Sequence, residues 1–197
     1  FITTDVNITP QMLQKALSSD VKDSLNMVSV DRDTSTNDTL CIMASGEAGN
    51  ALIDRTDTEY KKFCRALHEV TTAMCKKIAA DGEGATKLIE CTVRGAKSKQ
   101  VARTVAKSVV CSNLLKAAIF GADANWGRVL CAIGYSGAAV DVNKIGVAFV
   151  SAAGKIEVCE DGRGIDFSEA AAKKILFEKE IGIEIELHDG NYSSVGW

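Results

Sequence analysis

Two apolar periodicities follow one another along this chain of 197 residues, and they constrain its fold more than any other feature. Between positions 63 and 78, apolar residues recur at spacings of three and four. This pattern predicts one long helix with a core-facing stripe made of Phe63, Leu67, Val70, Met74 and Ile78. Residues 87–93 then alternate in polarity, which predicts a strand. Interleaved helices and strands predict a mixed α/β or α+β protein.

The same two patterns predict the other elements. Helices are expected from Pro10, which Thr9 caps, and at residues 20–25, 98–109, 113–120, 125–133 and 166–177. Strands are expected at residues 1–6, 27–30, 40–45, 138–142, 144–150, 155–159 and 182–190. A glycine-containing hairpin turn joins the strands at 144–150 and 155–159. We expect a domain boundary that separates residues 1–104 from residues 105–197.

Composition excludes several classes of protein. The net charge is −3 and the pI about 5.5, which argues against a nucleic-acid-binding surface. The sequence has no long apolar run typical of a membrane span and no N-terminal secretion signal. Its seven cysteines include no C-x-x-C pair and its two histidines lie far apart, so we expect neither zinc nor a disulfide framework. Reduced thiols, no signal and an acidic pI predict a cytoplasmic protein. No cluster of cysteine, histidine or carboxylate residues has the spacing of metal ligands, so no metal is expected.

Three polar clusters carry the candidate chemistry, and each also has a purely structural interpretation. Residues 31–38 read "DRDTSTND", which either forms a tight turn between two strands or lines a cleft. Residues 81–84 read "DGEG", which either ends a helix with Gly82 in the left-handed conformation or directs the Glu83 carboxylate into a cleft. Residues 121–128 read "GADANWGR", which is not a dinucleotide fingerprint. His68 is expected to be a partly buried or surface histidine, and 161–164 a plain turn.

Five segments resemble one known family. The segments "FITTDVNIT", "SVDRDTSTNDT", "DGEGATK", "TVRGAKS" and "FGADANWGRV" have the order and spacing of the β chain of bifunctional ornithine acetyltransferase, also called glutamate N-acetyltransferase. The resemblance covers nearly the whole chain. Members of that family commonly carry glycine where Arg32 stands.

The resemblance implies a precursor that cleaves itself before a threonine, whose hydroxyl then becomes the nucleophile. It implies an α/β core of the N-terminal-nucleophile type, to which residues 1–104 contribute, and a smaller α+β domain at 105–197. The nucleophile is expected four residues before Phe1, so no catalytic residue is assigned within the chain. The family also continues past residue 197 with further substrate ligands. Glu83 is the substrate-binding residue that the resemblance carries over.

The implied reaction moves the acetyl group of N-acetylornithine to glutamate through an acetyl-threonine in arginine biosynthesis, without a cofactor or metal. The implied partner is the α chain of the same precursor, in an α2β2 heterotetramer, with neither nucleic acid nor membrane involved. Thr34 and Asn37 are expected to brace the site from the polar loop. Use of acetyl-CoA as a second donor stays open at this stage. Two alternatives also stay open: an aminopeptidase or amidase on the same scaffold, and a non-catalytic half of a two-chain protein.

Overall fold

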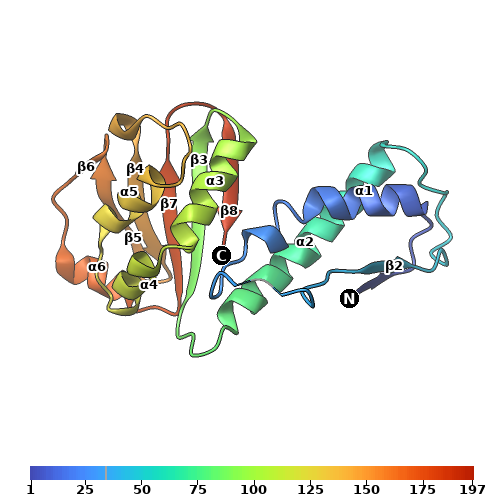
Figure 1. The fold of residues 1–197 in the computed structure, drawn as a ribbon, viewed down its shortest axis with the longest axis horizontal. Helices are drawn as coiled ribbons and strands as arrows, with labels where there is room; N and C mark the ends of the chain where they lie inside the picture. The colour runs from blue at the N-terminus through green and yellow to red at the C-terminus, as the bar shows by residue number, and fades with distance from the viewer. Residues whose placement is uncertain (34) are drawn as a thin grey trace. The chain divides into compact units, whose positions relative to one another are not determined.

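The computed structural model describes residues 1–33 and 35–197, and its helices and strands follow one another in the mixed α/β order that the sequence predicts (Figure 1). In chain order the elements are β1 (Ile2–Thr4), α1 (Pro10–Asp20), the 3-10 turn η1 (Leu25–Met27), β2 (Ile42–Ala44), α2 (Thr58–Ala80), β3 (Leu88–Ala96), α3 (Lys99–Val110), α4 (Asn113–Phe120), α5 (Trp126–Gly134), the 3-10 turn η2 (Val142–Lys144), β4 (Gly146–Ser151), β5 (Gly154–Glu160), β6 (Arg163–Gly164), α6 (Glu169–Leu176), β7 (Glu180–Glu186) and β8 (Tyr192–Gly196).

The chain forms two compact units. The first comprises Phe1–Asn26 and Arg32–Met74, and the second comprises Met27–Asp31 and Cys75–Trp197. The boundary expected near residue 104 falls inside α3, so the units divide the chain at other places. Most of α2 therefore belongs to the first unit and its last turn and a half to the second.

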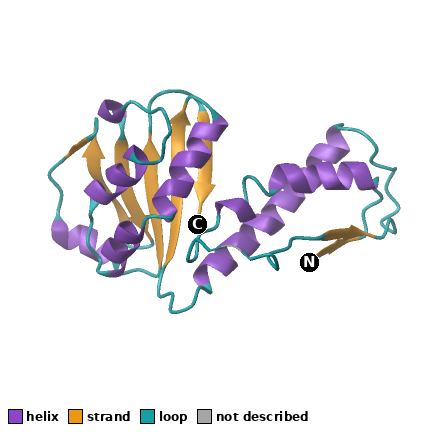
Figure 2. Ribbon diagram, viewed as in Figure 1, coloured by secondary structure: helices purple, strands orange, loops and turns teal. Residues whose placement is uncertain are grey.

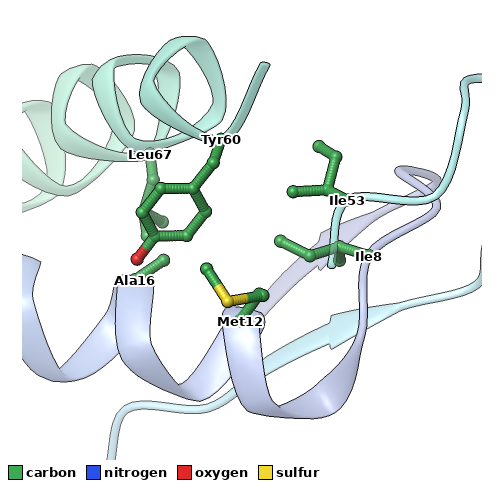
Figure 3. Close-up of a cluster of buried hydrophobic side chains, with 6 residues drawn as sticks. All are labelled: Ile8, Met12, Ala16, Ile53, Tyr60 and Leu67. Atoms are coloured by element: carbon green, nitrogen blue, oxygen red, sulfur yellow. The ribbon is translucent and has the colours of Figure 1, made fainter. Parts of the chain in front are cut away.

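The core of the first unit lies between α1 and the first turns of α2. Thr9 caps α1 as predicted, because its hydroxyl accepts a hydrogen bond of 3.3 Å from the Met12 amide and Pro10 follows at the first helical position. Six buried side chains form the cluster that Figure 3 shows: Ile8, Met12, Ala16, Ile53, Tyr60 and Leu67. The short parallel strands β1 and β2 pack against this cluster through partly buried Ile2 and Ile42.

The long helix α2 forms as predicted. Along most of its length, however, the buried residues lie one position after the residues predicted to be buried. Val70, Met74 and Ile78 are exposed by 48%, 45% and 42%. The buried line instead runs through Leu67, Thr71 and Cys75. Thr71 can lie in this line because its hydroxyl donates to the Leu67 and His68 carbonyls, 3.1 Å away in each case. Polarity alone assigns threonine to the surface, and this local hydrogen bonding explains the error.

The second unit is built on a six-stranded sheet with the order β6-β5-β4-β7-β3-β8. β3 and β7 run parallel, and every other neighbouring pair in this sheet is antiparallel. Figures 1 and 2 show α3, α4 and α5 over one face of the sheet. α3 packs on β3 and β8, while α6 packs on β4 and β5. Antiparallel strands commonly have one apolar face packed on the core and one more polar face.

Apolar and polar residues alternate along the strands, and this gives the sheet one apolar face and one polar face. In β7, Ile181, Ile183 and Ile185 are buried, while Glu184 and Glu186 between and after them point to the other face. The predicted hairpin between β4 and β5 is confirmed by their antiparallel pairing. The mixed α/β class is confirmed as well.

Three predicted elements are wrong. Residues 27–30 form no regular strand: the Met27 carbonyl and the Ser29 amide bond to the backbone of Trp197, and the Val28 and Val30 carbonyls accept hydrogen bonds from Lys107 and Lys116. Residues 20–25 turn without forming a separate helix. Residues 138–142 form no strand, since the Asp141 carboxylate accepts a 3.1 Å hydrogen bond from the Asn143 amide and begins η2. The prediction also missed β8, which pairs with β3.

Glu184 on the polar face of the sheet gives an expected pH dependence of stability. Its carboxylate oxygens lie 2.8 Å from the Lys155 ammonium and 3.4 Å from the Arg94 guanidinium. The hydrogen bond from Lys155 is the main cause that lowers the pKa of Glu184 below its ordinary value of 4.5. The folded state therefore binds this proton less tightly than the unfolded state. The stability gained is present above the unfolded pKa and is lost as the pH falls through the folded pKa.

We accordingly expect Glu184→Gln to lower the free energy of unfolding by less than about 1 kcal/mol at neutral pH, since the ion pair is partly exposed. At about pH 3 the variant and the parent should become nearly equal in stability. Urea unfolding at both pH values measures the difference, with Glu157→Gln on β5 as the matched control. A deficit of the same size at both pH values would contradict an electrostatic origin.

Candidate functional site

Glu83 lies in a tight turn between α2 and β3. The helix ends with the Asp81 amide donating to the Lys77 carbonyl over 3.0 Å, and the next turn closes with the Ala85 amide donating to the Gly82 carbonyl over 2.9 Å. The left-handed residue of this turn is Gly84, with φ of 70°, and not Gly82 as predicted. Glu83 is exposed, and within the described residues its carboxylate has no hydrogen-bonding or ionic partner. The turn therefore presents a free carboxylate that a cation from solution can reach.

Gly82 lies where a second segment approaches this turn. A Cβ atom added to Gly82 would lie 3.1 Å from Cγ1 of Val30, so this position is closely packed. The Val30 carbonyl accepts a 2.7 Å hydrogen bond from the Lys116 ammonium, which also reaches the Ser29 hydroxyl at 3.4 Å. The turn that carries Glu83 thus packs, at Gly82, against a backbone segment that a lysine holds in place.

Further contacts fix the same segment from its other side. The Ser29 amide donates to the Trp197 carbonyl over 2.7 Å, and the Trp197 amide donates to the Met27 carbonyl over 3.1 Å. Lys107 donates to the Val28 carbonyl. Burial is the main cause that lowers the pKa of Lys107; the nearby Cys111 opposes this shift, and the Lys116 ammonium group adds to it. Neither lysine was singled out in the sequence, because both belong to amphipathic helices in which a lysine is ordinarily a surface residue.

The described residues of the polar loop, 31–33 and 35–38, are exposed, and residues 35–38 form a local turn. The Ser35 amide donates to the Asp38 carboxylate over 3.0 Å, and the Asp38 amide donates to the Ser35 carbonyl over 3.2 Å. The Asn37 amide donates to the Ser35 hydroxyl over 3.1 Å, so its own side chain takes no part in these bonds. Thr34 lies outside the described residues. These bonds show that the loop satisfies much of its own backbone.

Arg32, at the start of this loop, has φ of 79°. A residue with a Cβ atom is strained in this left-handed region by roughly 1–2 kcal/mol, whereas glycine is not. The family resemblance places a glycine at this position, and the backbone conformation gives a physical reason for it. Asn37 lies in the first compact unit and Glu83 in the second, so each is described only within its own unit.

Two other residues noted in the sequence have structural roles. Asn125 begins α5 by accepting a 3.3 Å hydrogen bond from the Arg128 amide, as predicted. His68 is half exposed, and its Nδ1 lies 2.7 Å from the buried carboxylate of Asp20, to which the Ser24 hydroxyl also donates over 3.0 Å. This pair links α1 to α2 within the first unit.

All seven cysteines lie among the described residues and are free thiols. Burial raises the pKa of Cys91 and of Cys159, which keeps these two thiols protonated, whereas Cys131 is exposed. In the part of the chain that the structure describes, no group of three or more histidine, cysteine or acidic side chains could hold a metal ion. Among the same residues, no helix combines the length and apolar character that a membrane crossing requires.

The fold and candidate site together define a mixed α/β protein with a carboxylate that has no partner among the described residues, in a turn that packs against a lysine-anchored segment. A model of the ArgJ family matches residues 1–197. Among curated proteins, the arginine biosynthesis bifunctional protein ArgJ 1 of Clostridium acetobutylicum is 52% identical over 197 residues. The arginine biosynthesis bifunctional protein ArgJ of Thermotoga neapolitana is 49% identical over the same length.

A solved structure agrees with these matches. The crystal structure of the arginine biosynthesis bifunctional protein ArgJ from Bacillus halodurans has a TM-score of 0.94 and 44% identity, covering 100% of this chain and 91% of that one. The chain therefore belongs to the ArgJ family, which confirms the resemblance seen in its sequence. It spans about half the length of the curated relatives it matches, 48% and 50% of the two named, as a C-terminal portion of them.

Proposed function

We propose that the chain is part of an acetyltransferase of arginine biosynthesis, which moves an acetyl group from N-acetylornithine to glutamate. Membership of a family whose relatives are named as bifunctional proteins of arginine biosynthesis supports this pathway. The observation within the chain that carries the proposal is the exposed Glu83 carboxylate, which has no partner among the described residues and stands in a turn flanked by glycines. N-acetylornithine retains one ammonium group, at the end of its side chain, and an ionised carboxylate is a suitable partner for it.

The proposed reaction has two steps. A threonine hydroxyl, outside this chain and preceding Phe1 in the family pattern, attacks the acetyl carbonyl of N-acetylornithine while the α-amine of the same threonine takes the hydroxyl proton. The amide C–N bond breaks, ornithine leaves with a proton on its amine, and an acetyl ester remains. The amine of glutamate then attacks the ester and regenerates the hydroxyl. Ping-pong kinetics follow from this scheme, and no step needs a metal or cofactor.

The proposed partner is the remaining N-terminal half of the family chain, as the α chain of an α2β2 assembly in the cytoplasm. The test is to co-express the two halves and assay acetyl transfer from N-acetylornithine to glutamate. Initial rates at several fixed glutamate concentrations should give parallel double-reciprocal lines. Release of acetate without glutamate would instead support an amidase, and transfer from acetyl-CoA to glutamate would add the second donor. An assembled complex without any acetyl transfer would contradict the proposal.

We also propose that Thr34 and Asn37 brace the site from the polar loop. Asn37→Ala should lower kcat by about two- to tenfold, the effect of one lost hydrogen bond. Thr34→Ala should have an effect of similar size. Thr36→Ala, on the same exposed turn, is the matched control and should leave kcat unchanged. Steady-state kinetics on variants with the parental melting temperature measure the effect. If both variants have the parental kcat, the loop only forms a local turn and does not brace the site.

A further inference from the structure

The turn that carries Glu83 is closed by its own hydrogen bond but is held in place by a neighbouring segment. The Ala85 amide donates to the Gly82 carbonyl over 2.9 Å, with Glu83 and Gly84 between them. This bond fixes the shape of the turn, but not its direction. Val30 supplies an external contact, because its Cγ1 would lie only 3.1 Å from a Cβ atom added to Gly82. Since Gly82 has no side chain, Val30 packs directly against the backbone of the turn.

Val30 can support the turn only if its own position is fixed. Its side chain is 43% exposed, so packing alone does not hold it. The Val30 carbonyl accepts a 2.7 Å hydrogen bond from the Lys116 ammonium on α4, which also lies 3.4 Å from the Ser29 hydroxyl. A charged donor makes a stronger and shorter hydrogen bond than a neutral one. Lys116 therefore ties Val30 to a helix, and Val30 passes this constraint on to the turn at Gly82.

We propose that Lys116 is a positioning residue for Glu83: by holding Val30 against Gly82, it directs the Glu83 carboxylate toward the ammonium group of the substrate. The inference rests on the proposed function for the identity of that substrate. All four residues belong to the second unit, which comprises Met27–Asp31 and Cys75–Trp197. Lys116 touches no reacting atom in this scheme. It acts by preorganisation, because a charged group held by its supporting contacts binds a ligand more tightly than one that must be ordered on binding.

The first test removes the ammonium group and keeps most of the side chain. In the co-expressed halves, Lys116→Met should raise KM for N-acetylornithine by about three- to tenfold and change kcat by less than about twofold, because Glu83 holds the substrate in the ground state and the transition state alike. Lys116→Arg keeps a charged donor and should rescue KM to within about twofold of the parent. Lys99→Met is the matched control and should leave KM unchanged, although it also removes an ammonium group that donates to a backbone carbonyl, that of Ser193 over 2.8 Å.

A double-mutant cycle separates positioning from a general effect on structure. In a Glu83→Gln background, Lys116→Met should change KM by less than about twofold, because the carboxylate that Lys116 positions is no longer present. A merely structural role would give the same fold-change in both backgrounds. Binding of ornithine, measured by calorimetry, provides a readout without turnover. Lys116→Met should weaken it by about three- to tenfold when Glu83 is present and by less than about twofold when glutamine replaces it.

A second set of variants tests the contact that transmits the effect and leaves Lys116 in place. Val30→Ala removes the methyl groups that face Gly82 and should raise KM by about two- to fivefold. Gly82→Ala adds a methyl group where only 3.1 Å is available and should raise KM as well. Combined, the two substitutions move a methyl group from one side of the contact to the other, so KM should return toward the parental value. These variants test the inference even if Lys116→Met lowers the melting temperature.

The outcomes distinguish this inference from the proposed function. Acetyl transfer with the parental KM in both Lys116→Met and Val30→Ala would overturn the positioning role and leave the enzyme assignment intact. Equal effects of Lys116→Met with and without the Glu83 carboxylate would also overturn it, as would parental ornithine affinity in Glu83→Gln. Weaker ornithine binding that depends on Glu83, in an assembly without acetyl transfer, would support the positioning role and contradict the function.

Discussion

Replacing Glu83 by glutamine is expected to lower kcat/KM for N-acetylornithine by about 10- to 100-fold in the assembled enzyme. The carboxylate is exposed and unpaired within the described residues, so its charge is available to a substrate ammonium group. A charge-assisted hydrogen bond contributes roughly 1.5–3 kcal/mol, and each 1.4 kcal/mol corresponds to about a tenfold change. Glutamine keeps the shape of the side chain and removes the charge. The melting temperature should stay the same, because an exposed carboxylate adds little to stability.

The chain offers a matched control for this experiment. Glu47 is also an exposed glutamate in a glycine-bounded turn, between Gly46 and Gly49, which both have positive φ. Glu47→Gln should leave kcat/KM at the parental value. If Glu83→Gln has the same kinetics as Glu47→Gln, Glu83 is only part of the turn that ends α2 and does not bind substrate.

The fold could be predicted from the sequence where burial follows polarity. β3, α3 and β7 have apolar residues at the period of their element, and the structure confirms all three. The stripe on α2 was misassigned because Thr71 is fully buried, and its hydroxyl bonds to carbonyls of its own helix. No count of apolar residues can detect a polar side chain that is satisfied locally.

Contacts between distant residues explain the other errors. Residues 27–30 have the β-branched composition of a strand, but Met27 and Ser29 bond to the backbone of Trp197, while the carbonyls of Val28 and Val30 accept from the ammonium groups of Lys107 and Lys116. β8 was missed because Ser193 and Ser194 weaken the apolar pattern, although Ser194 is buried against its neighbours in the sheet. Pairing partners remote in sequence, and not local preference, decide both segments.

The candidate site shows the same division. The glycines on both sides of Glu83 mark a turn in the sequence, and the turn is present, although the left-handed residue is Gly84. No sequence pattern indicates that Lys107 and Lys116 anchor the neighbouring segment, because their acceptors are backbone carbonyls of residues about 80 positions away. Side chains that act on a remote backbone become visible only once the chain is folded.

Gly162 provides the largest stability effect that we expect. In the sequence its segment is a plain turn, but in the structure a Cβ atom on Gly162 would lie 2.0 Å from the Val142 carbonyl oxygen, far inside contact distance. Its φ of 69° also lies in the left-handed region, and its amide donates to the Ile145 carbonyl over 2.8 Å, which fixes its position. Gly162→Ala should therefore combine backbone strain with overpacking and lower the free energy of unfolding by about 2–5 kcal/mol.

Gly137 separates these two contributions. Its φ of 76° is nearly the same, but nothing lies within 4 Å of an added Cβ atom. Gly137→Ala should therefore show the backbone strain alone, a loss of about 1–2 kcal/mol. Urea unfolding of both variants measures the difference, which is the overpacking against Val142. Equal losses in the two variants would mean that the turn between β5 and β6 moves away from Val142 at little cost, and the close packing of this turn would then not be what requires glycine.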